Sequence, residues 1–198
     1  MKPLILASAS ATRARLLAAA GVTFEIAAAA IDEEALKVDW LRKGYAATDM
    51  ARGLAEEKAR SVGMGWPGRI VLGCDQVLAL DGELISKCRT RIDALLLLRR
   101  LRAREHELVT AAVLARDGEM LWRHVDGSRL VMRDFSDTFL NEYVLRCAAA
   151  TTHCVGCYEL EGPGIQLFSR VDGDFFSILG LPLLPLLEEL RGLALLKP

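Results

Sequence analysis

Residues 69–87, RIVLGCDQVLALDGELISK, constrain the fold more than any other stretch of the chain. Within them, residues 70–72 form an apolar run after a Pro-Gly turn, and such a run is typical of a core strand. Asp75 follows at the point where this strand is expected to leave the core. Asp-Gly at 81–82 favours a tight hairpin, whose return strand should end at Lys87. The stretch therefore predicts either a functional carboxylate and ammonium or a solvated turn with two ordinary surface charges.

The length and composition of the chain fit one domain. With 198 residues, 52% of them hydrophobic, the chain can form one sizeable core, or two small lobes that share a core. We therefore expect a single domain over residues 1–198. The formal net charge of −1 provides no basic surface of the kind that binds many phosphates of a duplex, so we expect no nucleic-acid partner.

No segment fits a membrane span or an export signal. The apolar run near the N-terminus is short and ends in Ser and Arg, which is too little for a signal peptide. The apolar stretch after Leu179 is interrupted by prolines and glutamates, so it cannot span a bilayer. We expect a cytoplasmic protein that does not enter a membrane. Its five cysteines, an odd number, are then expected as free thiols.

Strand and helix patterns alternate along the chain, which predicts a mixed α/β fold. The expected strands are residues 4–7, 24–28, 70–72, 77–80, the return strand that ends at 87, 108–115, 120–124, 128–132, 164–171 and 175–178. The expected helices are residues 11–20, 48–63, 92–101, 137–146 and 182–191. Thr48 is the expected N-cap of the second helix, and Asp-Gly at 126–127 predicts a turn between two strands.

Motifs that identify a chemistry on their own are missing: the chain has no P-loop, no HExxH, no G-x-S-x-G and no complete dinucleotide fingerprint. Polar side chains instead gather near expected strand ends and on the second helix: Ser8, Ser10, Arg13, Glu33, Lys58, Asp75, Gln76 and Lys87. Such carboxylates and basic groups suit a polyphosphate with its divalent metal, because carboxylate oxygens bind hard cations and basic groups neutralise phosphate oxygens. Backbone N–H groups at the helix that Ser10 opens could also cradle an anion. Taken singly, each residue is better explained as a surface charge or a helix cap.

Seven segments together resemble a known family. They are LILASASATRARLL at 4–17, IDE at 31–33, LAEEKA at 54–59, LGCDQVLALDGELISK at 72–87, LRRLRAREHELVTA at 98–111, YELEGPGIQLFSRVDGD at 158–174 and GLPL at 180–183. In order and at similar spacing, they resemble the Maf family of nucleoside triphosphate pyrophosphatases. The resemblance covers nearly the whole chain.

The resemblance implies a Maf and inosine-triphosphatase-like fold, an elongated mixed sheet flanked by helices, with two lobes around a central cleft. It also implies hydrolysis of a nucleoside triphosphate substrate to the monophosphate and diphosphate, with a divalent cation such as Mg, Mn or Co. Members of the family suggest a homodimer, although no residue here requires one.

The same resemblance assigns roles to individual residues. The phosphate-contacting segment of the family corresponds to Ser8, Ser10 and Arg13, and the catalytic residues correspond to Glu33, Lys58, Asp75 and Lys87. Asp75 matches the general base, and Glu33 and Asp75 are the expected metal ligands. This agrees with the chemistry of the side chains, since a carboxylate can activate water while cations take up charge that develops on phosphate oxygens.

Two segments depart from the family pattern. Ala11-Thr12-Arg13 stands where the family has Pro-Arg-Arg, and Ser86-Lys87-Cys88 stands where it has Gly-Lys-Pro. Both changes fall in expected substrate-binding loops, although neither removes Arg13 or Lys87. An alternative is therefore a nucleotide-binding protein of weakened catalysis that is linked to septum formation.

The specificity positions of the family correspond to Thr12, Gln76 and Glu161. Gln after the catalytic Asp and Glu before the Gly resemble the 7-methyl-GTP hydrolases, and only Thr12 departs from that branch. A carboxylate offers two acceptors for the adjacent N1–H and N2–H₂ donors of guanine. A buried Glu161 would also attract the positive charge of the methylated base. The alternative within the family is a dTTP or UTP pyrophosphatase.

One local pattern favours a different chemistry. His153 precedes the C-x-x-C of Cys154 and Cys157, and Cys147 lies nearby, which are ligand types of a zinc site or a redox pair. No second ligand pair is close in sequence, and residues 155–156 resemble the start of a buried strand. We expect buried, inert thiols. His106 and His124 have no acidic partner in the local sequence, and we expect structural or exposed roles for both.

Overall fold

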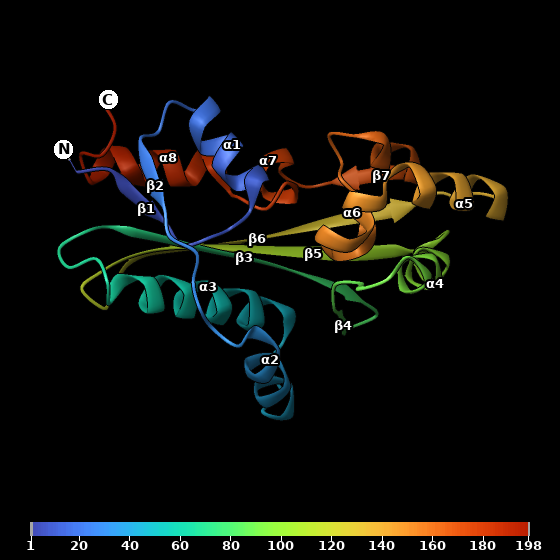
Figure 1. Cartoon of the computed structure of the whole chain (residues 1–198), viewed down its shortest axis with the longest axis horizontal. Helices are drawn as coiled ribbons and strands as arrows, with labels where there is room; N and C mark the ends of the chain where they lie inside the picture. The colour runs from blue at the N-terminus through green and yellow to red at the C-terminus, as the bar shows by residue number, and fades with distance from the viewer. Residues whose placement is uncertain (1, 198) are drawn as a thin grey trace. The chain divides into compact units, whose positions relative to one another are not determined.

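A computed structural model describes residues 2–197 of the chain (Figure 1). The strands are β1 (Leu4–Leu6), β2 (Phe24–Ile26), β3 (Val71–Leu80), β4 (Glu83–Ile85), β5 (Glu105–Arg116), β6 (Glu119–Met132) and β7 (Phe168–Asp172). The helices are α1 (Ala11–Ala19), α2 (Glu33–Arg42), α3 (Ala47–Gly63), α4 (Arg91–Leu101), α5 (Asp137–Arg146), α6 (Ala148–His153), α7 (Phe175–Ile178) and α8 (Leu183–Gly192), with 3₁₀ helices η1 (Val155–Cys157) and η2 (Pro163–Leu167).

The strands form one mixed seven-stranded sheet in the order β2-β1-β3-β5-β6-β7, with β4 paired to β3. β1 runs parallel to β2 and β3, whereas β3–β4 and β6–β7 are antiparallel. The prediction of a mixed α/β fold is therefore confirmed. No helix within residues 2–197 is both long and apolar enough to cross a membrane.

The chain separates into two compact units. Unit 1 contains the described residues up to Gln76, together with Thr110–Asp126 and the residues from Asp174 onward. Unit 2 contains Val77–Val109 and Gly127–Gly173. Strands β3, β5 and β6 contribute residues to both units.

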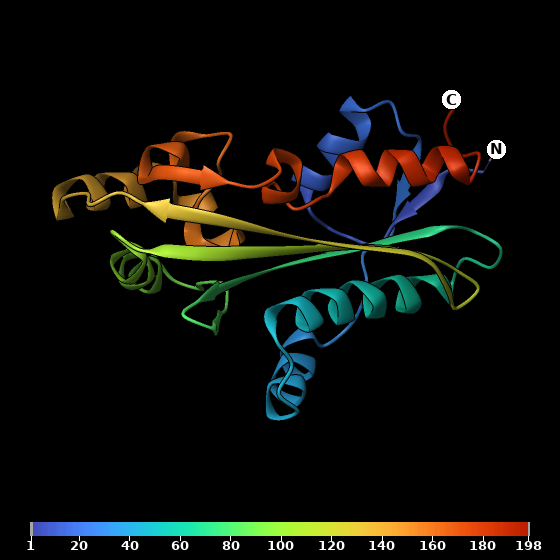
Figure 2. The same cartoon turned by 180° about the vertical axis from the view of Figure 1, so that it is seen from behind.

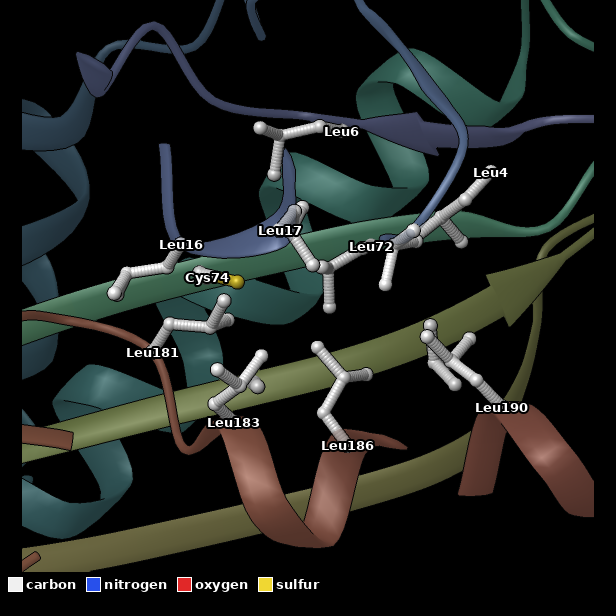
Figure 3. Packing of buried hydrophobic residues seen from close by; sticks show 13 residues of the cluster. Leu4, Leu6, Leu16, Leu17, Leu72, Cys74, Leu181, Leu183, Leu186 and Leu190 are labelled. Carbon is white, nitrogen blue, oxygen red and sulfur yellow. The ribbon is translucent and has the colours of Figure 1, made fainter. Parts of the chain in front are cut away.

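The core of unit 1 covers both faces of its strands, as expected where a strand pairs in parallel on both sides. Figures 1 and 2 show α1, α7 and α8 on one side of these strands and α3 on the other. Leu4 and Leu6 of β1 face the first side, while Ile5 packs with Val62 of α3 on the second. In the close-up of Figure 3, leucines of α1 and α8 converge on those of β1 and β3. The residues labelled there are Leu4, Leu6, Leu16, Leu17, Leu72, Cys74, Leu181, Leu183, Leu186 and Leu190.

Two helices of unit 1 differ from expectation. Helix α2 was not predicted, and none of its residues is buried, so it carries no apolar periodicity that a sequence could reveal. Asp32 caps it, and Trp40 packs on Gly53 of α3. Helix α3 begins at Ala47 rather than at Thr48. Its N-cap is Ala46, which supplies no side-chain acceptor, so the prediction of Thr48 as N-cap was wrong.

The β3–β4 hairpin is confirmed, but the strand before it is longer than expected. Asp81 and Gly82 both have positive φ and join Leu80 to Glu83, as in the tight turns that match strand twist. β3 does not end near Asp75, however, and that residue lies in the middle of a strand of 10 residues. Polar residues interrupt the apolar run there, but the strand continues through them. The return strand ends at β4, before Lys87.

Four further predictions in the C-terminal half were wrong, in whole or in part. No turn occurs at 126–127, because β6 continues through these residues as one strand. Residues 175–178 form helix α7 instead of a strand, since Asp174 accepts the backbone N–H of Ser177 as an N-cap. Residues 155–156 belong to η1, and the expected strand 164–171 divides into η2 and β7.

Unit 2 is built around α4, which contacts α5, α6 and η1. Thr90 and Asp93 form a capping box that begins α4. Gly156 of η1 lies so close to Leu78 of β3 that an added Cβ would be 2.7 Å from a Leu78 methyl carbon. Its φ of 83° is also one that glycine adopts without strain.

Candidate active site

The end of β1 and the middle of β3 form the framework of the candidate site. β1 pairs with β3 through Ile5 and Leu6, and β3 continues beyond the end of β1. The carbonyl of Cys74 lies past that ladder, and it accepts a hydrogen bond from Arg13 Nη1 at 3.1 Å. The same Nη1 lies 3.2 Å from the hydroxyl of Ser8, which follows β1. The first helix and two strands therefore meet at this point.

Glycine at position 73 lets α3 approach β3 closely. A Cβ added to Gly73 would lie 2.9 Å from the amide nitrogen of Ala59 and would overlap the carbonyl oxygen of Ala55. Gly73 and Asp75 share one face of β3, because alternate residues of a strand share a face. The close approach brings Lys58 of α3 to the carboxylate of Asp75. Glycine within a strand pattern is a signal of close backbone approach that the sequence already carried.

Lys58 joins the two candidate carboxylates. Its Nζ lies 2.9 Å from Glu33 Oε1, and it also donates to Asp75 Oδ1. Lys58 and Asp75 are only 8% and 6% exposed, so their charges need partners of opposite sign to offset the loss of hydration. The structure thus brings together three of the four predicted catalytic residues, Glu33, Lys58 and Asp75.

These two carboxylates suit a hard divalent cation. Glu33 and Asp75 present the oxygen ligands that Mg²⁺ and Mn²⁺ prefer, and together they carry more negative charge than Lys58 carries positive charge. Within residues 2–197, no group of three or more His, Cys, Asp or Glu side chains could hold a metal ion. A cation at this pair would therefore draw further ligands from phosphate oxygens and water, as Mg²⁺ does at nucleotide sites.

Arg13 is held by hydrogen bonds on several sides. Besides its bonds at Nη1, its Nε donates to the carbonyl of Gly180 at 2.7 Å. Ser10 caps α1 by accepting the backbone N–H of Arg13 at 3.3 Å, so this serine orients the helix start.

Burial raises the pKa of the Cys74 thiol to about 11, and the charges of Arg13 and Lys58 both act against that rise. Both cations therefore lie near this part of β3.

Gln76 points to the opposite face of β3 from Asp75, because neighbouring residues of a strand alternate. Its Nε2 donates to Thr110 Oγ1 and to the carbonyls of Ser177 and Ile178, so its side chain contacts β5 and α7. Sequence reasoning missed both Thr110 and Ser177. The bonds join residues that are 34 to 102 positions apart, and no local pattern signals such pairs.

The remaining predicted site residues occupy different surroundings. Thr12 is half-buried in the first turn of α1 in unit 1. Lys87 is exposed in the segment after β4 of unit 2. Glu161 also belongs to unit 2, and the expectation that it is buried was wrong. It is exposed because it lies in the turn before η2, where the N–H of Gly162 donates to the carbonyl of Glu159.

The cysteines form no disulfide, and all five are free thiols. Cys157 is buried as expected, whereas Cys147 and Cys154 are half-buried. Desolvation raises the pKa of the Cys154 thiol to about 11, which disfavours the reactive thiolate.

The two histidines near strand positions behave differently from each other. His106 is buried and structural, since its Nε2 lies 2.8 Å from the hydroxyl of Tyr158. Burial lowers the pKa of His106 to about 4. His124 does have an acidic partner, contrary to expectation, because β6 continues and places Asp126 3.1 Å from its Nε2.

The fold and this site define a mixed α/β protein with a buried lysine held between two carboxylates. Comparison with known proteins identifies the family. The family model described as Maf-like protein matches residues 3–193. A curated protein of Roseobacter denitrificans, named nucleoside triphosphate pyrophosphatase, is 50% identical over 193 residues, which cover 96% of this chain and 97% of that protein.

Two further relatives carry a more specific name. A protein of Brucella abortus is 46% identical over 188 residues, covering 95% of this chain and 94% of its own length. A protein of Rhizobium meliloti is 45% identical over 194 residues, covering 98% of each chain. Both are named 7-methyl-GTP pyrophosphatase. The chain described here belongs to the Maf family.

Proposed function

We propose that this protein is a hydrolase that cleaves a nucleoside triphosphate to the monophosphate and diphosphate. The observation that carries the proposal is the buried Lys58, which contacts both Glu33 and Asp75. A binding module has no need to hold two carboxylates around one buried ammonium. The names of relatives that are 45–50% identical over nearly the whole chain support the same activity.

Asp75 is the proposed general base. Its carboxylate accepts a proton from water, the water oxygen bonds to phosphorus, and the phosphoanhydride bond breaks to release diphosphate. Lys58 holds Asp75 in place, because a carboxylate fixed by a buried ion pair has few alternative orientations. Arg13 is the proposed contact for phosphate oxygens, with Ser8 and Ser10 orienting it. We propose that Lys87 contributes a further positive charge to phosphate binding.

A divalent cation, Mg, Mn or Co, is the proposed cofactor. Glu33 and Asp75 would hold it, since hard cations prefer carboxylate oxygens and take remaining ligands from phosphates. When bound, such a cation neutralises charge that develops on the phosphate oxygens. Because Lys58 contacts both carboxylates, it holds the side chain of Glu33 on α2 close to that of Asp75 on β3.

The proposed substrate is 7-methyl-GTP. Two of the similar proteins carry that name, and Glu161 offers two acceptors for the adjacent donors of guanine. Because Glu161 is exposed, water screens its attraction for the methylated base, so this charge term is smaller than a buried residue would provide. We therefore expect 7-methyl-GTP to be hydrolysed better than GTP, and both better than dTTP or UTP.

The decisive experiment is a diphosphate-release assay with 7-methyl-GTP, GTP, dTTP and UTP, each with Mg, Mn or Co. Glu161→Gln should erode the order of preference, with the exposed Glu159→Gln of the same segment as the matched control. A preference for dTTP or UTP would assign the protein to the other specificity of the family. If the protein binds nucleotides but hydrolyses none of them, it is a binding protein of weakened catalysis. That alternative is suggested by Ala11 and Thr12, which stand where the family has Pro-Arg.

The proposed setting is the cytoplasm, where nucleoside triphosphates and free thiols are both abundant. We also propose a homodimer, on the resemblance to the family alone, and no nucleic-acid partner, on the charge of −1. Sedimentation equilibrium of the full chain tests the first of these two proposals.

A further inference from the structure

Gln76 is fixed by three acceptors. Its Nε2 lies 2.8 Å from Thr110 Oγ1, 3.1 Å from the Ser177 carbonyl and 3.0 Å from the Ile178 carbonyl. An amide nitrogen has two N–H donors, so these partners use its donor capacity fully. Both N–H groups of the Gln76 amide therefore bond to acceptors within the protein, on α7 and β5.

The orientation of this amide follows from its partners. Carbonyl oxygens only accept, so Ser177 and Ile178 both require a donor. The hydroxyl of Thr110 donates its single hydrogen to the Ser177 carbonyl at 2.8 Å, so its oxygen can only accept from Gln76. A flipped amide would direct its oxygen at three acceptors. Chemistry alone thus assigns the nitrogen to the α7 side.

The Ser177 carbonyl is the centre of this arrangement. It accepts from Gln76, from Thr110 and from the backbone N–H of Gly180 at 2.9 Å. Ser177 itself is 1% exposed, and its hydroxyl donates to Asp126 at 2.6 Å. With its atoms held on every side, this carbonyl cannot move without breaking several hydrogen bonds.

Gly180 connects this centre to the phosphate side of the site. Its N–H donates to Ser177, and its carbonyl accepts from Arg13 Nε at 2.7 Å. Gly180 has a φ of +101°, and a Cβ there would lie 3.4 Å from Arg13 Nε, so glycine lets the carbonyl reach the guanidinium. A continuous chain of hydrogen bonds therefore runs from Thr110 and Gln76 to Arg13.

We infer that Gln76 and Thr110 are positioning residues that hold Arg13 through the Ser177–Gly180 segment. Gln76 faces away from Asp75, and its Nε2 donors end on Thr110 and on α7. The inference rests on the proposed function and deepens it, because it names the residues that hold the proposed phosphate contact. A Gln at this position then serves to fix α7 against β3.

The test compares Thr110→Val, which keeps the shape but removes the hydroxyl, with Thr110→Ser, which keeps the hydroxyl. We expect Thr110→Val to lower kcat/KM about fivefold, a typical effect of one lost hydrogen bond, for 7-methyl-GTP, GTP and dTTP alike. Thr110→Ser should restore the wild-type values. A changed ranking of the three bases in Thr110→Val would overturn the inference in favour of direct base readout through Gln76.

A double-mutant cycle shows whether the effect passes through Arg13. In the Arg13→Gln background, Thr110→Val should have almost no additional effect on kcat/KM, because the group it positions is gone. Additive losses would overturn the inference. So would a Thr110→Val protein that melts at a lower temperature but keeps wild-type kinetics, since that is the result of a merely structural role.

A binding measurement distinguishes failure of this inference from failure of the proposed function. The α,β-methylene analogue of GTP cannot be hydrolysed, and calorimetry gives its Kd for the wild type and each variant without turnover. If the wild type binds the analogue but hydrolyses nothing, the proposed function fails, while a weaker Kd in Thr110→Val that Thr110→Ser restores still supports the inference. If the wild type binds no triphosphate, both are overturned.

Discussion

Gly73 on β3 and Ala59 on α3 lie so close that a Cβ on the glycine would be 2.9 Å from the alanine amide nitrogen. Backbone faces backbone at this contact, so neither side can move away as a flexible side chain would. The contact sets the distance at which Lys58 meets Asp75. Glycine at position 73 is therefore part of the site although it carries no functional group.

Gly73→Ala should separate α3 from β3. We expect a loss of stability of at least about 3 kcal/mol, the upper range for an overpacked core, together with a large loss of activity. Gly63→Ala at the end of α3 is the matched control, since its Cβ would meet only Val71 at 4.0 Å. Chemical denaturation of both variants measures the effect. Equal stability of the two variants would contradict the backbone contact.

Asp75→Asn keeps the shape of the side chain but removes the proposed base. Loss of a general base lowers the rate roughly 10²- to 10⁴-fold, and we expect kcat to fall within that range. Asp81→Asn in the exposed hairpin turn is the control and should keep near wild-type turnover. Single-turnover kinetics with 7-methyl-GTP gives the comparison. Retained turnover in Asp75→Asn, at unchanged nucleotide affinity, would exclude Asp75 as the base.

Removal of divalent metal should abolish activity, and Mg, Mn or Co should restore it. Glu33→Ala should raise the metal concentration needed for half-maximal rate, because one of two carboxylate ligands is lost, and should leave the order of base preference unchanged. Glu34→Ala is the control, since Glu34 is exposed and pairs with Lys37. Titration with Mn²⁺ followed by electron paramagnetic resonance reports metal binding directly. Full turnover in excess chelator would disprove the metal requirement.

His106 should make stability depend on pH. Burial lowers its pKa from 6.5 to about 4. Between these two pH values, His106 is therefore protonated in the unfolded chain but neutral in the folded protein. The free energy of unfolding should therefore be highest above pH 6.5 and fall by about 3 kcal/mol as pH decreases to 4. Urea unfolding across this range measures the slope. His106→Gln should flatten it, whereas His153→Gln at an exposed position should not.

Sequence reasoning located the parts of the fold that local chemistry determines. The hairpin at Asp81-Gly82 followed from turn preference, and the helix that Ser136 caps followed from N-cap chemistry. Helix α2 was missed because it buries no residue. The turn expected at 126–127 failed because tertiary pairing overrides a turn dipeptide, as β6 pairs with β7 just beyond it.

The candidate site likewise contains residues whose placement the sequence predicted and residues whose contacts it could not predict. Glu33, Lys58 and Asp75 were predicted from resemblance and side-chain chemistry, and the structure places them in contact. The partners of Gln76 could not be predicted, because its bonds to Thr110 and Ser177 depend on three segments that only the folded chain brings together. The exposure of Glu161, by contrast, could have been predicted, because Gly-Pro-Gly at 162–164 directly after it is a turn signal.

Helix α3 begins at Ala47, and its N-cap, Ala46, supplies no side-chain acceptor, which determines the end at which the helix would open. An uncapped first turn leaves backbone N–H groups to water, so fraying and amide hydrogen exchange should begin there. The turn that carries Lys58 lies further along and is anchored by Ala55 and Ala59 against Gly73. Local opening of α3 therefore starts at the end away from the ion pair. The first turn can unfold locally while the ion pair between Lys58 and Asp75 stays intact.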